Sequence, residues 1–525
     1  MSSTRTGRSG HGVVLVVAAL VSKLLGAIYR IPLTNILGVE GIGIYQLVFP
    51  VYALMLTLSS SGIPTAISRL VSERMAVGDA GGSRNIVRTA SILLTLLGFV
   101  FALLMALLSL PLATLAGRAE LVTSYLVLAP SVLFVSASAV IRGYYEGNML
   151  MAPTAVKELV SQSVKMGAGL MLASYLSRYG IVMAVTGAVL GVTISEAMSL
   201  LVLLVMYIRR QKPNIDMHIS DIRVNSREII RVAMPISGAG IVMPIVQVVD
   251  SILIVQILRL AGEDIARATS LYGLLQGPVS TLVNMPIVVI LAIAVMIVPV
   301  VSAGRARHDA NFVRTKTAVS LKVAYMVGVP SFFGMFAVAG DIMAILYPAL
   351  SKADLELGAW LLRLASFSII SLSLMEIYSS LLSALDKSRV GLRTLIAGAV
   401  VKVAISVPLI YYLSISGACI ANLISYGIVA VLDMVFMRKY LGVNEGLMQA
   451  VAKILISGIA MLAVILPITH FVSNIYVAIL VAVPLGVAIY AVFMLLLRVM
   501  TRDELYLMPL GKLLVYLDKR IHKER

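Results

Sequence analysis

Long apolar stretches recur along the whole chain, and they constrain its fold more than any other feature. A helix needs about 20 apolar residues to cross a bilayer. We count about fourteen such stretches in the 525 residues, of which 60% are hydrophobic and 13% charged, with a mean hydropathy of +1.00. Ordinary globular domains carry roughly 25% charged residues. Because the stretches are too long for barrel strands, the sequence predicts an all-α polytopic membrane protein.

The spacing of these stretches predicts short loops throughout. No loop is long enough for a soluble catalytic or nucleotide-binding domain, and no Walker A pattern occurs. We therefore expect neither an enzyme nor an ATP-driven pump. The expected spans are 13–37, 42–68, 89–112, 120–141, 154–177, 181–208, 229–258, 274–301, 317–339, 357–385, 394–413, 416–437, 451–471 and 474–497.

Lysine and arginine are distributed unevenly between the two sides of the membrane. With the N-terminus inside, most of the 42 Lys and Arg residues fall in cytoplasmic segments. This asymmetry follows the positive-inside rule, explains most of the net charge of +17 without nucleic acid, and predicts both termini in the cytoplasm. We expect the basic tail, 498–525, to form an interfacial helix on anionic lipid. The expected outside segments hold Arg118, Arg178, Arg259, Arg267, Lys352 and Arg363.

Short sequence matches suggest an internal repeat. Gly187-Ala188 recurs as Gly417-Ala418, and Val164-Lys165 recurs as Val401-Lys402, in the second of the two expected halves. An even number of spans in each half gives both halves the same orientation, as in parallel-repeat transporters. We predict two pseudo-symmetric six-helix lobes, 1–212 and 213–440, two extra helices in 441–497, and the tail.

The first span carries two cations, Lys23 and Arg30, but no acidic residue between Val13 and Leu37. A charge near the bilayer centre costs at least about 2.5–3.5 kcal/mol, so such residues usually face a bundle interior or a wet cavity. Lys23 and Arg30 are two helical turns apart and share one face. The pattern predicts a cationic stripe that lines a cavity and binds an anion; the alternative is that both side chains snorkel to the headgroups.

Two further lysines stand inside later spans. Lys165 and Lys402 occupy related positions in spans 5 and 11. They either line the same cavity as substrate-binding residues or pair with Glu196 and Glu376 as structural ion pairs. Those two carboxylates are also candidates for ion coupling.

Two other charged residues have open roles. Asp250 in span 7 could bind a coupling H⁺ or Na⁺, or could offset Arg30. Arg69 stands at a cytoplasmic helix end, where it either contacts substrate or anchors the helix at the membrane edge. The single cysteine, Cys419, excludes an internal disulfide, and the five scattered histidines predict no metal site and no metal cofactor.

Proline and glycine mark the positions where helices can bend. Pro50, Gly62 and Pro64 interrupt span 2, and spans 7 and 8 carry several more. These interruptions favour spans 1, 2, 7 and 8 as gates, although proline is also common in membrane helices in general.

Three motifs resemble one transporter family. The stretch SKLLGAIYRIPLTNILGVEGIGIYQLVFPVYALMLTLSSSGIPTAISRLVSE, RGYYEG at 142–147 and MPIVQVVDSILIVQIL at 243–258 are similar to the stage V sporulation protein B group of polysaccharide exporters. That group belongs with MurJ-type lipid II flippases in the multidrug/oligosaccharidyl-lipid/polysaccharide superfamily. The resemblance implies a V-shaped two-lobe fold whose cationic cavity takes the diphosphate of a polyprenyl-linked sugar.

The resemblance also assigns residues of the first helix. The family's Ser-Arg pair corresponds to Ser22-Lys23, and its Arg-Asp pair corresponds to Tyr29-Arg30. Its second-helix arginine has no counterpart here, where apolar residues near Met55 stand instead.

Together these features predict a monomeric flippase of the cytoplasmic membrane. It would move a polyprenyl-diphosphate-linked saccharide, such as lipid II or a related cell-envelope precursor, by alternating access. Its partners would be membrane lipid and the lipid-linked saccharide, with no nucleic acid. The alternative is a MATE-like multidrug/cation antiporter, although cationic drugs favour carboxylates rather than the cations of this first helix.

Overall fold

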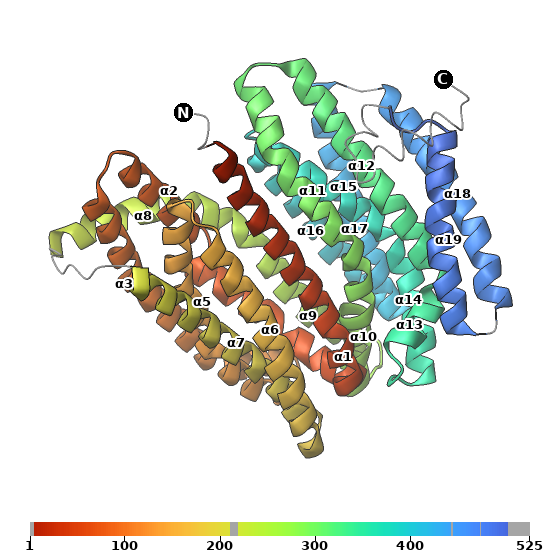
Figure 1. The fold of residues 1–525 in the computed structure, drawn as a ribbon. Helices are drawn as coiled ribbons and strands as arrows, with labels where there is room; N and C mark the ends of the chain where they lie inside the picture. The colour runs from red at the N-terminus through yellow and green to blue at the C-terminus, as the bar shows by residue number, and fades with distance from the viewer. Residues whose placement is uncertain (1–4, 211–218, 443–444, 473, 502–525) are drawn as a thin grey trace. The chain divides into compact units, whose positions relative to one another are not determined.

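Every secondary-structure element in the part of the chain that the structure describes is a helix (Figure 1). The structure is a computed structural model that describes residues 5–210, 219–442, 445–472 and 474–501. The expected interfacial helix of the tail lies almost wholly outside these residues. The chain divides into two compact units, Met1–Gly277 and Pro278–Arg525.

Unit 1 contains ten of the α-helices, which run from red to yellow-green in Figure 1. Three glycines allow three of these helices to lie close together: a Cβ at Gly191 would lie 2.3 Å from the Cα of Gly169, and a Cβ at Gly26 would lie 3.4 Å from Gln162 Oε1. The helices are α1 (Arg5–Ser60), α2 (Ile63–Ala76), α3 (Ala80–Leu107), α4 (Ser109–Leu115), α5 (Leu121–Gly147), α6 (Ala152–Leu176), α7 (Ile181–Arg210), α8 (Ile219–Gly240), α9 (Val242–Leu260) and α10 (Ile265–Leu274), with a 3₁₀ turn η1 (Ser177–Tyr179) between α6 and α7.

The long helix α1 consists of two helical segments that meet at Gly38. Gly38 has φ 64° and ψ −178°, a conformation that glycine adopts without the steric cost that a Cβ would bring. A second break follows at Gly62, whose φ of 73° separates α1 from α2. Pro64 stands in the first turn of α2, where its missing N–H leaves no helical hydrogen bond unmade.

The seventh expected span is also broken, between α8 and α9 at Ile241. This break lies against the break at Gly62: the Ser237 hydroxyl donates a hydrogen bond to the Ser61 carbonyl, and a Cβ at Gly240 would lie 2.9 Å from Ser61 Oγ. Gly62 and Gly240 therefore coincide with actual interruptions of the helices, whereas Pro50 lies inside α1 without one; the role of these positions as gates stays a prediction.

The second segment of α1 packs closely on α10. A Cβ at Gly43 would lie 2.1 Å from the Thr269 carbonyl oxygen, and a Cβ at Gly273 would lie 2.1 Å from that of Val39. Gln46 adds a 2.6 Å hydrogen bond to the Gln276 carbonyl. Only glycine permits this approach of the two backbones.

Within its described residues, unit 2 contains nine α-helices, which run from green to blue in Figure 1. A π-helical turn, η2 (Leu275–Val279), contains Pro278 and leads into α11. The helices are α11 (Ser280–Ala306), α12 (Ala310–Ala337), α13 (Ala339–Leu346), α14 (Lys352–Ser366), α15 (Ser368–Ala384), α16 (Ser388–Leu413), α17 (Ile415–Leu441), α18 (Glu445–Phe471) and α19 (Ile475–Leu496).

The apolar helices identify a multi-pass membrane protein. Among the described residues, eleven helices are long and apolar enough to cross a membrane, or twelve when the bent pair α14–α15 forms one span. Large apolar side chains on these helices are highly exposed, for example Leu480 at 75%, which is typical of a lipid-facing surface. The expected count of fourteen is larger because it divides α1 at Gly38 and includes α6, which is helical but less apolar. The expected lobe boundaries stay a prediction.

Candidate functional site

Lys23 and Arg30 lie on the first segment of α1, which is continuously helical up to Gly38. The side chain of Lys23 is exposed and that of Arg30 is half-buried. In the part of the chain that the structure describes, neither cation forms an ion pair with a carboxylate. The predicted spacing on one helix face is therefore present, and Arg30 is the member of the pair that reaches the interior of unit 1.

Tyr29 connects this part of α1 to α6, and the ammonium of Lys165 lies 5.7 Å from the centroid of its ring. The tyrosine is buried, and Gly169 of α6 makes room for its hydroxyl, since a Cβ there would lie 2.6 Å from Oη. A cation over an aromatic face is stabilised by about 0.5–2 kcal/mol. Tyr29 thus holds Lys165 beside the helix that carries Arg30.

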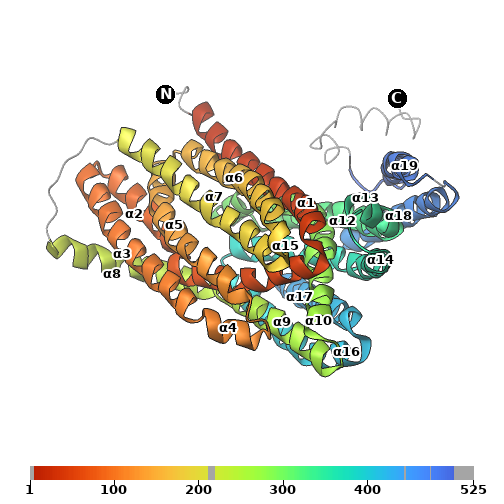
Figure 2. The ribbon, with the colours of Figure 1, turned by 90° about the horizontal axis from the view of Figure 1, so that it is seen from below.

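Glu196 on α7 faces α6 and is held by two groups there. Ser161 Oγ donates a 3.0 Å hydrogen bond to Glu196 Oε1, and Lys157 Nζ lies 3.7 Å from Glu196 Oε2. Lys157 also lies 3.4 Å from Glu158. Figure 2 shows α1, α6 and α7 side by side, so these groups belong to one region of unit 1.

This region, which we name the α1–α6–α7 cluster, has an excess of positive charge. The charged groups close enough to act on the Lys165 ammonium are Arg30, Lys157, Glu158 and Glu196. With Lys165 itself, the cluster holds three cations and two carboxylates. A low-dielectric region strengthens such charge interactions, so the unbalanced cation favours a bound anion.

Aromatic side chains close the cluster on the second segment of α1. Tyr45 and Tyr52 are buried, and Phe49 stacks between them with ring centroids 4.4 and 5.9 Å away. The Tyr45 hydroxyl lies close enough to the Arg30 guanidinium for an electrostatic interaction between the two groups.

The other sequence candidates lie on other helices than α1, α6 and α7. Lys402 on α16 is buried and Glu376 on α15 is half-buried; both belong to unit 2, and neither is without a partner. Asp250 is buried on α9, close to Tyr272 of α10. Arg69 is exposed on α2 and pairs with Glu73 one turn along, at 2.8 Å.

Two buried charged residues, Lys157 and Asp433, were not predicted as site residues from the sequence. Lys157 falls at the expected membrane edge, yet the structure buries it beside Glu196. Asp433 on α17 is only 2% exposed and accepts a 2.6 Å hydrogen bond from Thr394 of α16. In the described residues, no cation forms an ion pair with Asp433. An acidic residue inside the apolar stretch 416–437 was the signal that could have identified it.

Comparison with known proteins places the fold and the family. The model of the polysaccharide biosynthesis protein family matches residues 11–305, more than half of the chain. The chain belongs to this family. It is 25% identical to stage V sporulation protein B of Bacillus subtilis (strain 168) over 516 residues, which cover 96% of this chain and 98% of the relative.

Solved structures of two transporter types share the fold. The lipid II flippase MurJ in an inward closed conformation matches with a TM-score of 0.71 and 16% identity, over 93% of this chain and 99% of that chain. An inward-facing multidrug resistance MATE family transporter of the MOP superfamily matches with a TM-score of 0.68 and 16% identity, over 80% and 94%. The resemblance drawn from the sequence motifs is confirmed.

Proposed function

We propose that this member of the polysaccharide biosynthesis protein family is a flippase. It moves a polyprenyl-diphosphate-linked saccharide, lipid II or a related cell-envelope precursor, across the cytoplasmic membrane by alternating access. It performs no covalent chemistry. The name of the solved MurJ structure and the family description support this class of cargo.

The observation that carries the proposal is the excess positive charge of the α1–α6–α7 cluster. Arg30 and Lys165 converge from two helices, and the nearby carboxylates are fewer than the cations. A diphosphate satisfies such a site with charge-assisted hydrogen bonds, which are roughly twice as strong as neutral ones. Lys23, on the same face of α1 and exposed, meets the diphosphate first, while the prenyl chain stays in lipid.

The proposal includes fourteen spans and a cytoplasmic location for both termini. The twelve spans suggested by length and composition become fourteen when α1 counts as two spans and α6 as another. A reporter fused after Arg307 or Arg525 should lie in the cytoplasm, and one after Gly262 or Ala353 should lie outside. A fusion found on the opposite side disproves the topology from that point onward.

We further propose that a cation gradient, of H⁺ or Na⁺, drives the cycle of a monomer. Asp250, Glu196 and Glu376 remain candidates for the coupling carboxylate. Asp250 is buried, and Glu196 accepts a 3.0 Å hydrogen bond from Ser161. Replacing each carboxylate by its amide, as in Asp250→Asn, Glu196→Gln and Glu376→Gln, identifies the coupling group. Only loss of that group should abolish the response of transport to an imposed gradient.

A MATE-like cation antiporter is the second candidate, supported by the MATE match in fold. A cationic drug needs a surplus of carboxylates, which the α1–α6–α7 cluster lacks. The two proposals differ in the sign of the cargo. Antiport should protect a drug-sensitive host against cationic dyes, whereas an anion-selective flippase should give no protection.

Reconstitution tests the flippase directly. Purified protein in liposomes should move a labelled polyprenyl-diphosphate saccharide from one leaflet to the other, read by enzymatic access to the sugar. Inorganic pyrophosphate should compete, and a neutral polyprenyl glycoside should not be moved. A lipid mass spectrum of the purified protein identifies the natural saccharide. Movement of the neutral glycoside at the same rate would disprove diphosphate recognition.

A further inference from the structure

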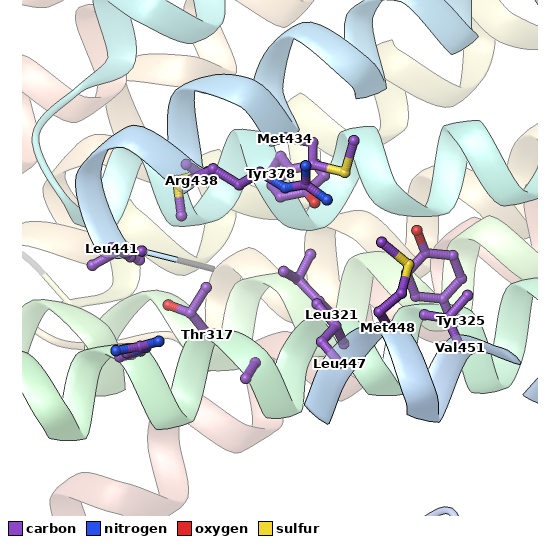
Figure 3. Close-up of a pocket in the computed structure, with 14 residues that line it drawn as sticks. Thr317, Leu321, Tyr325, Tyr378, Met434, Arg438, Leu441, Leu447, Met448 and Val451 are labelled. Carbon is purple, nitrogen blue, oxygen red and sulfur yellow. The ribbon is translucent and has the colours of Figure 1, made fainter. Parts of the chain in front are cut away.

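A basic pocket lies within unit 2, among α12, α15, α17 and α18 (Figure 3). It has about 730 Å³ of empty space, including its open mouth. Its interior is apolar and aromatic, whereas Arg314, Thr317 and Arg438 bring polar groups to it. The interior residues include Leu321, Tyr325, Tyr378, Met434, Met437 and Met448.

Arg438 supplies the charge on which the inference rests. Figure 3 shows its side chain extending toward Tyr378, and its guanidinium acts electrostatically on both Tyr378 and Tyr325. Within the described residues it forms no ion pair. Arg314 is a second guanidinium at the pocket but already engages another group.

Thr317 provides an independent indication of a ligand. Its side chain is 94% buried in the α12 face of the pocket, and its hydroxyl oxygen has no hydrogen-bond partner among the described residues. A buried hydroxyl without a partner is destabilising, because it has lost its hydrogen bonds to water and gained none in the protein. The hydroxyl is closed off from solvent as it stands, so the Thr317 side chain must turn to its second common helical rotamer to donate to a ligand oxygen in the pocket, which would remove this cost.

We propose that this pocket binds the phosphate headgroup of an anionic membrane lipid. The headgroup accepts hydrogen bonds from Arg438 and Thr317, and the start of an acyl chain packs on Leu321, Tyr325 and Met448. The pocket lies between loops expected on the cytoplasmic side, where anionic headgroups meet basic pockets between transmembrane helices. The chain's own tail, 502–525, has more basic than acidic residues, so charge complementarity favours a lipid over the tail.

Native mass spectrometry of the full-length protein in neutral detergent tests this proposal. Phosphatidylglycerol is titrated against wild type, Arg438→Gln and the control Lys439→Gln, which removes the same charge from an exposed neighbour that does not line the pocket. We expect Arg438→Gln to weaken binding about tenfold or more, as for loss of a charged hydrogen bond, and Lys439→Gln to change it less than about twofold.

Further variants in the same experiment separate the contributions of the Thr317 hydroxyl, the Arg438 charge and the space for the acyl chain. Thr317→Val keeps the side-chain volume and should weaken binding about fivefold, the effect of one neutral hydrogen bond. Leu321→Trp should fill the pocket and block the lipid, with thermal unfolding confirming that the variant is folded. Equal weakening by Arg438→Gln and Lys439→Gln would show a diffuse surface effect and overturn the proposal. So would inorganic phosphate that displaces the lipid at equal concentration, because the site would then recognise free phosphate.

Discussion

The helix pairs α6–α7 in unit 1 and α16–α17 in unit 2 are built on the same contact. In the first pair a Cβ at Gly187 would lie 2.6 Å from the Leu172 carbonyl oxygen, and in the second a Cβ at Gly417 would lie 2.0 Å from that of Leu409. In both, a glycine near the start of the second helix permits close packing on the end of the first. The packing of the two pairs is thus alike.

Their charges are not alike. In α6–α7 the carboxylate of Glu196 faces Lys157 and has Lys165 nearby. In α16–α17 the sequence counterpart of Lys157 is Thr394, and the buried carboxylate of Asp433 receives only its neutral hydroxyl as a hydrogen-bond donor in the described residues. With Arg30 of α1 beside it, the first helix pair lies in a region that has one more cation than carboxylates, whereas the second buries a carboxylate without an ion-pair partner among the described residues.

The difference teaches that packing and cargo charge are encoded by separate residues. Glycines set how closely two helices approach, and a handful of polar side chains set the sign of the charge that the region attracts. The same fold accordingly occurs in transporters that are named for different cargo, as the matches to the lipid II flippase MurJ and to a multidrug resistance MATE transporter illustrate.

The largest effect should come from the cations of α1, which have no counterpart in the second helix pair. Lys23→Ala and Arg30→Ala should each abolish flipping, and Arg30→Lys should retain less activity than Lys23→Arg, because a point charge cannot reproduce a bidentate grip on phosphate. The measurement is complementation of a flippase-depleted bacterium, with protein abundance followed by blot. Normal growth of both alanine variants would place the substrate site elsewhere.

The related lysines Lys165 and Lys402 sharpen the comparison. Lys165→Met should weaken substrate binding about tenfold or more through loss of a charged contact, with little change in the melting temperature. Lys402→Met removes a buried, partnered cation and should mainly lower the melting temperature. Binding to labelled lipid and thermal unfolding of the same preparations check both. The reverse pattern would move the cargo site to unit 2.

The ion pair between Lys157 and Glu196 should stabilise α6–α7. Lys157→Met should cost about 3 kcal/mol, the lower end of the range for breaking a buried pair, because Glu196 then loses its closest cation. The double variant Lys157→Met/Glu196→Gln should recover much of this loss, as a double-mutant cycle in denaturant would measure. Strict additivity of the two single changes would mean that the pair does not interact.

A smaller effect is expected in α16–α17. Thr394→Val deprives the Asp433 carboxylate of its donor and should cost about 1–2 kcal/mol, whereas Asp433→Asn keeps an oxygen that accepts the same hydrogen bond and should cost less. Thermal unfolding of the two variants provides the test. A larger loss in Asp433→Asn would indicate that the negative charge itself is needed there.

The smallest effect should belong to Arg69. Its pair with Glu73 is exposed to solvent, which screens the attraction, so Arg69→Ala should leave both the melting temperature and transport close to those of the wild type. Transport below half of the wild-type rate would restore Arg69 as a substrate contact.

The sequence by itself determined the helical membrane class, the family and the bends. Apolar length predicts spanning helices because backbone groups in lipid must be satisfied within the helix. Glycine and proline predict breaks because they change the allowed backbone conformations, and the structure has interruptions at Gly38, Gly62 and Pro278. The sequence also identified the cations Lys23 and Arg30, because a charged residue inside an apolar stretch can be recognised without the structure.

Only the tertiary structure decided which charges meet. Periodicity places Lys157 at the edge of its helix, but packing of α6 on α7 buries it beside Glu196. Spacing gives no sign that Tyr29 would hold Lys165, or that Thr394 would face Asp433 across two helices. Such contacts depend on the rotation and separation of neighbouring helices, which many distant residues set together.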